Sequence, residues 1–438
     1  MTVLLRGGTV LPLREGGGSG RADVLISGTR VAEIGAVQTK ADETVDVDGC
    51  VLMPGLVQTH VHLVQTIFRG LAEDRSLLDW LRRRVWPLEA ALDEASLRAS
   101  VRLGIAELLL GGTTTVLDMG TTHHGDAVAE ELVRSGIRAR FGQAMMDTGD
   151  GAPAELLETT RASLDASAAL VKRWAKAAGG RVGYVYAPRF ALSCSRELLE
   201  AVTTLSKMNG LLVHTHSNEN VDERAAVQHM TGRTPIGYLV DVGIASERTI
   251  VAHGVHLDDE EIELLRTTKT SVVHCPSSNL KLGSGIAQVA RLRAAKITVG
   301  IGADGAACNN TLDGFEEVRL ATLLARVVSG MGTLSAADAL AMATREGAKM
   351  LRLGDEVGML EVGKRADIVV LDLGRLDGPA GDATTRIVFG GGSRAVRDVL
   401  VDGEFLVRDG ALTKLDAGEV RAKAAEQLGP LLQRAHLA

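Results

Sequence analysis

Two histidines one residue apart, His60 and His62, close an apolar run that begins at Val51. In a β-strand, side chains at positions i and i+2 point to the same face of the sheet. Two imidazoles on one face at the end of a strand can therefore reach the same metal ion. The sequence predicts a metal site at this strand end.

Further metal-ligating side chains lie at the ends of later apolar runs, namely His216, His253, His274 and Asp304. A spacing of ~20–40 residues with helical patterns in between is typical of successive βα units. A parallel barrel brings the C-terminal ends of its strands to one face. A single histidine after a strand is more often a packing residue, but burying all these polar groups without a shared purpose would cost free energy repeatedly. We therefore expect them to meet in space.

Imidazole and carboxylate ligands suit zinc, and a catalytic zinc keeps one coordination position open for water. We assign the ligands to three histidines and one aspartate: His60, His62, His216 and Asp304. Zinc lowers the pKa of bound water to about 7, which makes hydroxide available for attack at neutral pH. The sequence thus predicts one zinc ion per chain.

Attack of this hydroxide on a carbon atom also requires groups that move protons. Asp304, beside the metal, can accept the proton of the water. Glu219 lies three residues after His216 and can protonate a ring nitrogen and then the leaving group, as general acid catalysis requires. His253 ends the neighbouring strand, where it can orient or polarise the hydroxide. Of the other histidines, we expect His229 and His436 to face solvent and His123 and His124 at most to line the pocket.

The composition fits a single large enzyme that acts on a small molecule. The chain has 438 residues, of which 45% are apolar, and its 50 glycines suit many tight turns between strands and helices. A net charge of −7 argues against nucleic-acid binding, which depends on phosphate neutralisation by Lys and Arg. We find no signal peptide and no apolar run long enough for a membrane span. The four cysteines form no paired motif, which indicates reduced thiols, so we expect a cytoplasmic protein. We also expect a homo-oligomer.

The order of apolar patterns predicts an α/β fold in three parts. From residue 54 to 354, apolar strands alternate with amphipathic helical stretches, which favours a TIM-type (β/α)8 barrel as the catalytic domain. Residues 1–53 and 355–438 are rich in short strands and turns. We expect these two end segments to join in one small β-sandwich, followed by a final helix over about 417–436.

The motifs of this chain resemble those of the amidohydrolase superfamily, and more closely those of its aminohydrolase branch. The motifs that carry the resemblance span most of the chain: Pro54–His62, His216-x-x-Glu219, Ala252–His253, His274–Gly285, Gly302–Gly305 and Gly358–Val369. The resemblance implies a TIM barrel with one zinc or sometimes iron(II), and by matching position it assigns the same ligands and the same acid–base groups. The reaction that it implies is hydrolytic deamination of a purine or nucleoside, with release of ammonia.

For the substrate, one set of motifs is similar to the deaminases of 5′-substituted adenosines. Residues 65–74, 80–89 and 305–313 resemble enzymes that act on methylthioadenosine, S-adenosylhomocysteine or 5′-deoxyadenosine. The position of Glu89 matches a carboxylate that grips the ribose hydroxyls there. An arginine that would bind a homocysteine carboxylate is replaced by Gln143, which argues against S-adenosylhomocysteine. A 5′-substituted adenosine such as 5′-deoxyadenosine or methylthioadenosine is therefore the first expectation.

A second set of motifs favours guanine or a related aminopurine. Residues 187–195 are similar to a guanine deaminase motif, in which the residues matching Arg189 and Phe190 contact and stack on the base. Gln65 falls where a guanine-contacting glutamine lies. The full set of expected substrate contacts is Gln65, Trp86, Glu89, Arg189, Phe190, His274 and Asn309.

Other interpretations stay open for several of these residues. Arg189 can be a structural ion-pair partner, Phe190 and Trp86 can pack in the wall, and Glu89 can cap a helix. An s-triazine amino- or chlorohydrolase shares the metal site, although a triazine has no ribose for Glu89 to grip. A non-catalytic binding barrel would be expected to lack a ligand or the acid, and none is missing here.

Overall fold

The strands that carry the predicted ligands belong to one parallel sheet. The structure is a computed structural model that describes residues 1–375 and 381–437. Over these residues, eight parallel strands follow one another in the order β12-β10-β9-β8-β17-β16-β15-β14, and the short β18 also pairs with β8. Their bounds are β8 (Leu56–His62), β9 (Thr113–Asp118), β10 (Arg138–Phe141), β12 (Val182–Tyr184), β14 (Val213–Ser217), β15 (Thr249–His253), β16 (Ser271–His274), β17 (Val299–Ile301) and β18 (Asp304–Gly305).

Backbone hydrogen bonds join the two ends of this strand order. Tyr186, two residues after β12, donates its N–H to the carbonyl of Leu212 at 2.9 Å. Its own carbonyl accepts the N–H of His214, in β14, at 2.8 Å. The sheet therefore closes on itself, and the TIM-type barrel expected from the sequence is confirmed.

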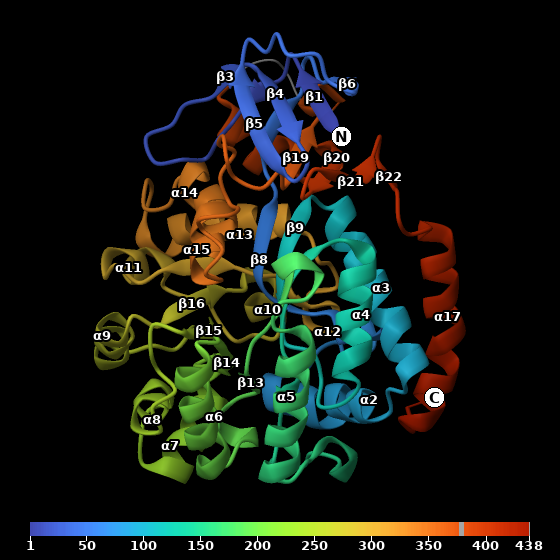
Figure 1. Cartoon of the computed structure of the whole chain (residues 1–438). Coiled ribbons are helices and arrows are strands. Elements are labelled where there is room, and N and C mark those ends of the chain that lie inside the picture. The colour runs from blue at the N-terminus through green and yellow to red at the C-terminus, as the bar shows by residue number, and fades with distance from the viewer. Residues whose placement is uncertain (376–380, 438) are drawn as a thin grey trace.

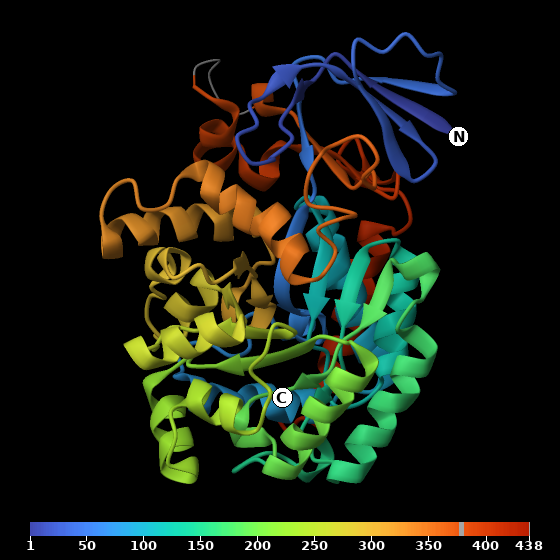
Figure 2. The ribbon, with the colours of Figure 1, turned by 60° about the vertical axis from the view of Figure 1, so that its left-hand side comes forward.

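Helices surround the barrel because most strands are followed by an amphipathic segment that buries one face against the sheet (Figure 2). The longer ones are α3 (Glu94–Leu110), α4 (Gly125–Ser135), α5 (Thr160–Trp174), α6 (Arg196–Asn209), α7 (Val221–Thr231), α9 (Asp259–Thr268) and α13 (Gly314–Ser329). Shorter helices include α1 (Leu77–Trp80), α2 (Trp86–Ala90), α8 (Pro235–Asp241), α10 (Pro276–Lys281), α11 (Val289–Ala294), α12 (Ala306–Asn309), α14 (Ala336–Ala341) and α15 (Gly347–Met350). Several begin at a capping side chain; Asp93, for example, accepts the N–H of Ser96 at the start of α3.

Strands from both ends of the chain form two further sheets above the barrel (Figure 1). One sheet has the order β5-β4-β1-β6, and the other runs β22-β21-β20-β19-β7-β2-β3. The bounds are β1 (Thr2–Arg6), β2 (Thr9–Val10), β3 (Gly20–Arg21), β4 (Asp23–Ser27), β5 (Arg30–Gly35), β6 (Glu43–Asp46), β7 (Val51–Pro54), β19 (Ile368–Leu371), β20 (Val396–Val401), β21 (Glu404–Arg408) and β22 (Ala411–Leu412). Leu5, Leu52, Ile368 and Leu400 belong to one shared hydrophobic cluster. The end segments thus pack together as expected, while the exact domain bounds stay a prediction.

The C-terminal helix α17 (Ala417–Arg434) packs beside α3 on the outside of the barrel (Figure 1). Over residues 1–375 and 381–437, no helix has both the length and the apolar character needed to cross a lipid bilayer.

A buried ion-pair cluster connects the barrel to the C-terminal strands. Arg138, on β10, donates two hydrogen bonds to Asp367, at 2.7 and 2.9 Å, and a third to Asp402 at 2.6 Å. Arg138 and Asp367 are 2% and 4% exposed, so their charges depend on each other for stabilisation.

We expect Arg138→Ala to lower the free energy of unfolding by about 3–5 kcal/mol, because it leaves the buried carboxylate of Asp367 without its cation. Urea denaturation followed by circular dichroism measures this change. The matched control is Arg161→Ala, which breaks an exposed ion pair with Asp165 and should have little effect. Equal stability of the Arg138→Ala variant and the native protein would contradict the prediction.

Candidate active site

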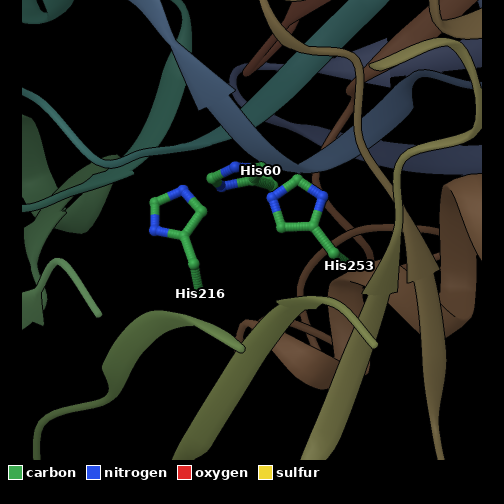
Figure 3. A group of neighbouring side chains, drawn as sticks. All are labelled: His60, His216 and His253. Carbon is green, nitrogen blue, oxygen red and sulfur yellow. The ribbon is translucent and has the colours of Figure 1, made fainter. Parts of the chain in front are cut away.

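The predicted ligands meet at the C-terminal end of the barrel strands. Nε2 of His60 and Nε2 of His62 lie 3.3 and 3.5 Å from Oδ1 of Asp304. Nε2 of His62 lies 3.2 Å from Nε2 of His216. Figure 3 shows the imidazoles of His60, His216 and His253 converging, and the potential ligand atoms of these three residues lie within 4.8 Å of one another.

A neighbouring histidine determines which nitrogen of His60 is free. Nδ1 of His214 donates to the carbonyl of Ile250 at 3.2 Å. Burial holds the pKa of His214 well below its usual range. A neutral His214 therefore accepts at Nε2, so the 2.7 Å contact from His60 is a hydrogen bond donated by Nδ1 of His60. The lone pair of His60 is then on Nε2, which faces Asp304.

The same reasoning applies to His216. Its Nδ1 donates to the carbonyl of Arg189 at 2.7 Å. Burial also holds the pKa of His216 well below the usual range, so its ring is neutral at pH 7. Nε2 of His216 is left as a lone-pair donor that faces His62.

This arrangement fits a divalent metal ion. Nε2 of His60 is buried without a hydrogen-bond partner, and it faces a carboxylate oxygen of Asp304 at 3.3 Å. Both atoms are acceptors, so they repel each other unless a cation lies between them. The donors are imidazole nitrogens and a carboxylate, the set that zinc and similar ions prefer.

Two of the predicted catalytic residues have strained backbone conformations. His253 and Asp304 have φ angles of 77° and 63°, in the left-handed region that non-glycine residues rarely occupy. Asp304 is held there by the hydroxyl of Ser278, which donates to Oδ2 at 2.6 Å, and by the N–H of Gly305, which donates to Oδ1 at 2.8 Å. The local fold thus constrains the direction of the carboxylate.

Glu219 and His253 form the proton-handling pair of the site. Oε2 of Glu219 lies 3.4 Å from Nε2 of His253, whose Nδ1 donates to Oδ1 of Asn279 at 3.0 Å. Burial, together with the negative charges of Asp304 and Glu223, raises the pKa of Glu219 well above its usual value. Burial lowers the pKa of His253 to about 4. The raised pKa favours the protonated form of Glu219, which suits it as a proton donor, and His253 is neutral at pH 7.

Beside the ligands lies a cavity whose walls include some of the predicted substrate contacts. It is lined by His62, Gln65, Leu77, Trp80, Leu81, Arg189, Phe190, His216, Glu219, Glu223, His253 and Asp304. Gln65, Arg189 and Phe190 are thus brought together as expected.

The other predicted contacts lie away from the cavity wall. Trp86 is buried in the core beside the cavity, and His274 is buried with its pKa lowered to about 3 by burial. Asn309 donates to the carbonyl of Ala303 and to Glu317, each at 2.8 Å, so it holds its own loop. Among the remaining histidines, His123, His124, His229 and His436 are exposed.

Glu89 lies behind Arg189 and Gln65 and makes an ion pair with Arg189. The Arg189 guanidinium donates to both carboxylate oxygens, at 2.6 and 3.1 Å, and Gln65 and Thr121 donate at 2.8 and 3.2 Å. The Glu89 side chain is fully buried. The ribose contact predicted for Glu89 therefore requires this network to open.

Three residues of the site were not singled out by the sequence interpretation. His214 orients His60, Ser278 orients Asp304, and Glu223 lines the cavity next to Glu219. His214 carries a signal that could have found it, since it precedes His216 by the same spacing that separates His60 from His62. Ser278 and Glu223 have no such pattern.

Residues 51–406 match the model of the protein family described as the amidohydrolase family. The chain belongs to this family. Similar amidohydrolases include a 5-methylthioadenosine/S-adenosylhomocysteine deaminase of Halobacterium salinarum, 37% identical over 94% of both chains. A 5′-deoxyadenosine deaminase of Methanothermobacter thermautotrophicus is also 37% identical, over 98% of this chain and 99% of its own.

A solved structure shares the arrangement of the whole chain. It is an adenosine deaminase from Xanthomonas campestris with bound zinc, 30% identical, which superimposes with a TM-score of 0.92. The match covers 100% of this chain and 99% of that one.

We expect His60→Ala and Asp304→Ala each to lose the bound divalent metal, because each removes a ligand from a set that leaves one position open. Elemental analysis of the purified variants measures the metal content. His229→Ala is the matched control, since His229 is exposed on α7 and should leave the metal in place. Native metal content in both ligand variants would contradict the assignment.

Proposed function

We propose that this amidohydrolase is a hydrolytic deaminase of an adenosine derivative, with 5′-deoxyadenosine or methylthioadenosine as the preferred substrate and ammonia as a product. The observation that carries the proposal is the buried Glu219–His253 pair beside a converging His–His–His–Asp set. Full-length similarity to deaminases of adenosine derivatives supports the choice of reaction.

The chemistry of the residues follows from their protonation states. We propose one zinc ion per chain, with iron(II) as the alternative, held by His60, His62, His216 and Asp304. When bound, such an ion lowers the pKa of water to about 7 and so supplies hydroxide at neutral pH. Protonated Glu219 donates to the ring nitrogen next to the amino-bearing carbon, and Asp304 receives the proton of the water. Transfer of a proton to the amino group then allows ammonia to leave.

The substrate is a small molecule, and the cytoplasmic location and homo-oligomeric state expected from the sequence stay predictions.

Glu219→Gln should keep the metal and the fold but lower kcat by at least ~10²-fold, the usual scale for losing an acid–base group. His253→Asn should behave similarly, because His253 lies beside the proton donor. Steady-state ammonia release and elemental analysis measure the two properties. Glu197→Gln, on the exposed face of α6, is the control. Normal turnover of either active-site variant would remove that residue from the mechanism.

Guanine is the second candidate substrate, because Gln65 and Arg189, rather than Glu89, face the cavity. Both residues can donate to a carbonyl oxygen of a base. A nucleoside instead needs its ribose hydroxyls accepted, and Glu89 is the carboxylate proposed for that contact. Guanine therefore needs Arg189 to donate to the base, whereas a nucleoside needs Glu89 to accept from the ribose instead of from Arg189.

We expect the native enzyme to deaminate 5′-deoxyadenosine or methylthioadenosine with a kcat/KM at least ~10²-fold higher than that for adenine, since a site that binds a hydroxyl rejects an analogue without it. Glu89→Gln should raise KM for the nucleoside. Ammonia release is measured across both nucleosides, adenine, guanine, isoguanine and hydroxytriazines. Efficient guanine turnover that Arg189→Ala abolishes, with both nucleosides inert, would replace the nucleoside by guanine.

A further inference from the structure

The turn that carries Glu219 is held by a buried carboxylate on the following helix. Three successive backbone N–H groups of this turn donate to Glu223: Asn218 at 3.2 Å to Oε1, and Glu219 and Asn220 at 2.7 and 3.4 Å to Oε2. Glu223 is 1% exposed, and Asn218 has a left-handed φ of 57°. The backbone N–H groups of residues 218–220 therefore donate to the side chain of Glu223 rather than to a regular series of backbone carbonyls.

An ordinary capping role does not account for this pattern. Glu223 is the third residue of α7, and in a capping box its side chain accepts the N–H of the N-cap residue, here Asn220. That bond is the longest of the three, at 3.4 Å, whereas the shortest comes from Glu219 at 2.7 Å. The carboxylate is thus centred on Glu219, one residue before the N-cap.

The other side of the turn is anchored independently. The side-chain amide of Asn218 donates to Glu261 and to the carbonyl of His256, each at 2.9 Å. Glu261 is itself paired with Arg224. By contrast, among residues 1–375 and 381–437 no Lys, Arg or His forms an ion pair with Glu223. Its acceptors are therefore directed at the turn rather than at a cation.

We infer that Glu223 is a positioning residue for the reaction: by accepting the main-chain N–H groups of residues 218–220, it fixes the place of the Glu219 carboxyl beside His253. The inference rests on the proposed function, in which Glu219 is the proton donor. It deepens that proposal by assigning a role to a buried acid on the cavity wall.

The test is a double-mutant cycle with Glu223→Gln and Glu219→Gln. Glutamine keeps the shape of Glu223 but has only one accepting oxygen, so in either orientation its NH2 group faces at least one N–H of the turn that Glu223 accepts. We expect Glu223→Gln to lower kcat at least ~10-fold, with KM changed less than ~3-fold and the metal retained. In the Glu219→Gln background, the same change should lower kcat by less than ~2-fold, because Glu223 acts through Glu219.

Glu131→Gln is the matched control. Glu131 is a buried carboxylate on α4, 3% exposed, and is paired with Arg98 and Arg102 outside the site. This variant can lose stability, but its kcat should equal that of the native enzyme. If Glu223→Gln does not fold, Glu223→Asp takes its place, since it keeps the charge and withdraws the oxygens by one methylene.

A second readout does not depend on turnover. Hydrogen exchange of the amides of residues 218–220 should become at least ~10-fold faster in the Glu223 variant and stay native in Glu131→Gln. Unchanged exchange there, a native kcat, or losses that simply multiply in the double variant would each overturn the positioning role. A native protein that releases no ammonia from any adenosine derivative would instead overturn the proposed function, and the exchange measurement would still decide the role of Glu223.

Discussion

The active site depends on buried imidazole and carboxylate groups whose lone pairs point at one position. These lone pairs must also stay unprotonated. Removing an imidazole or carboxylate from water is costly unless its other polar atom has a partner. The barrel meets this requirement for two of the rings by fixing the second nitrogen: that of His60 through His214, and that of His216 through the carbonyl of Arg189. His214 lies on β14, which β15, β16 and β17 separate from β8 in the strand order, so the tautomer of His60 depends on the closure of the sheet.

A second feature recurs around the barrel. Two buried glutamates, Glu223 on α7 and Glu317 on α13, each accept hydrogen bonds from a segment that precedes their own helix in the chain. Glu317 accepts the N–H of Ser277 at 3.0 Å and the amide of Asn309 at 2.8 Å. Burial raises the pKa of each carboxyl to about 7. One of these segments carries Glu219, and the other includes Ser278, which donates to Asp304, so the helices outside the barrel contribute directly to the geometry inside it.

The sequence predicted the barrel and the convergence of His60, His62, His216 and Asp304 because strand ends have a simple periodic signature. The same holds for Glu219, three residues after a ligand. Contacts between side chains that are distant in sequence carry no such signature. The pairing of Arg189 with Glu89 depends on how helix α2 packs against the segment that follows β12, and the two residues are 100 positions apart in the chain. Motif similarity therefore assigned both residues to the substrate, whereas the structure shows them bonded to each other.

The pairing of β7 with β19 links the first ligand strand to the end of the chain. β7 continues almost directly into β8, which carries His60 and His62, and its residues Val51–Pro54 pair with Ile368–Leu371. During synthesis on the ribosome, β7 lacks this neighbour until more than 300 residues have followed it. The anchor of the first ligand strand is thus among the last parts of the fold to be completed, and a nascent chain carries all four ligands before this support for them exists.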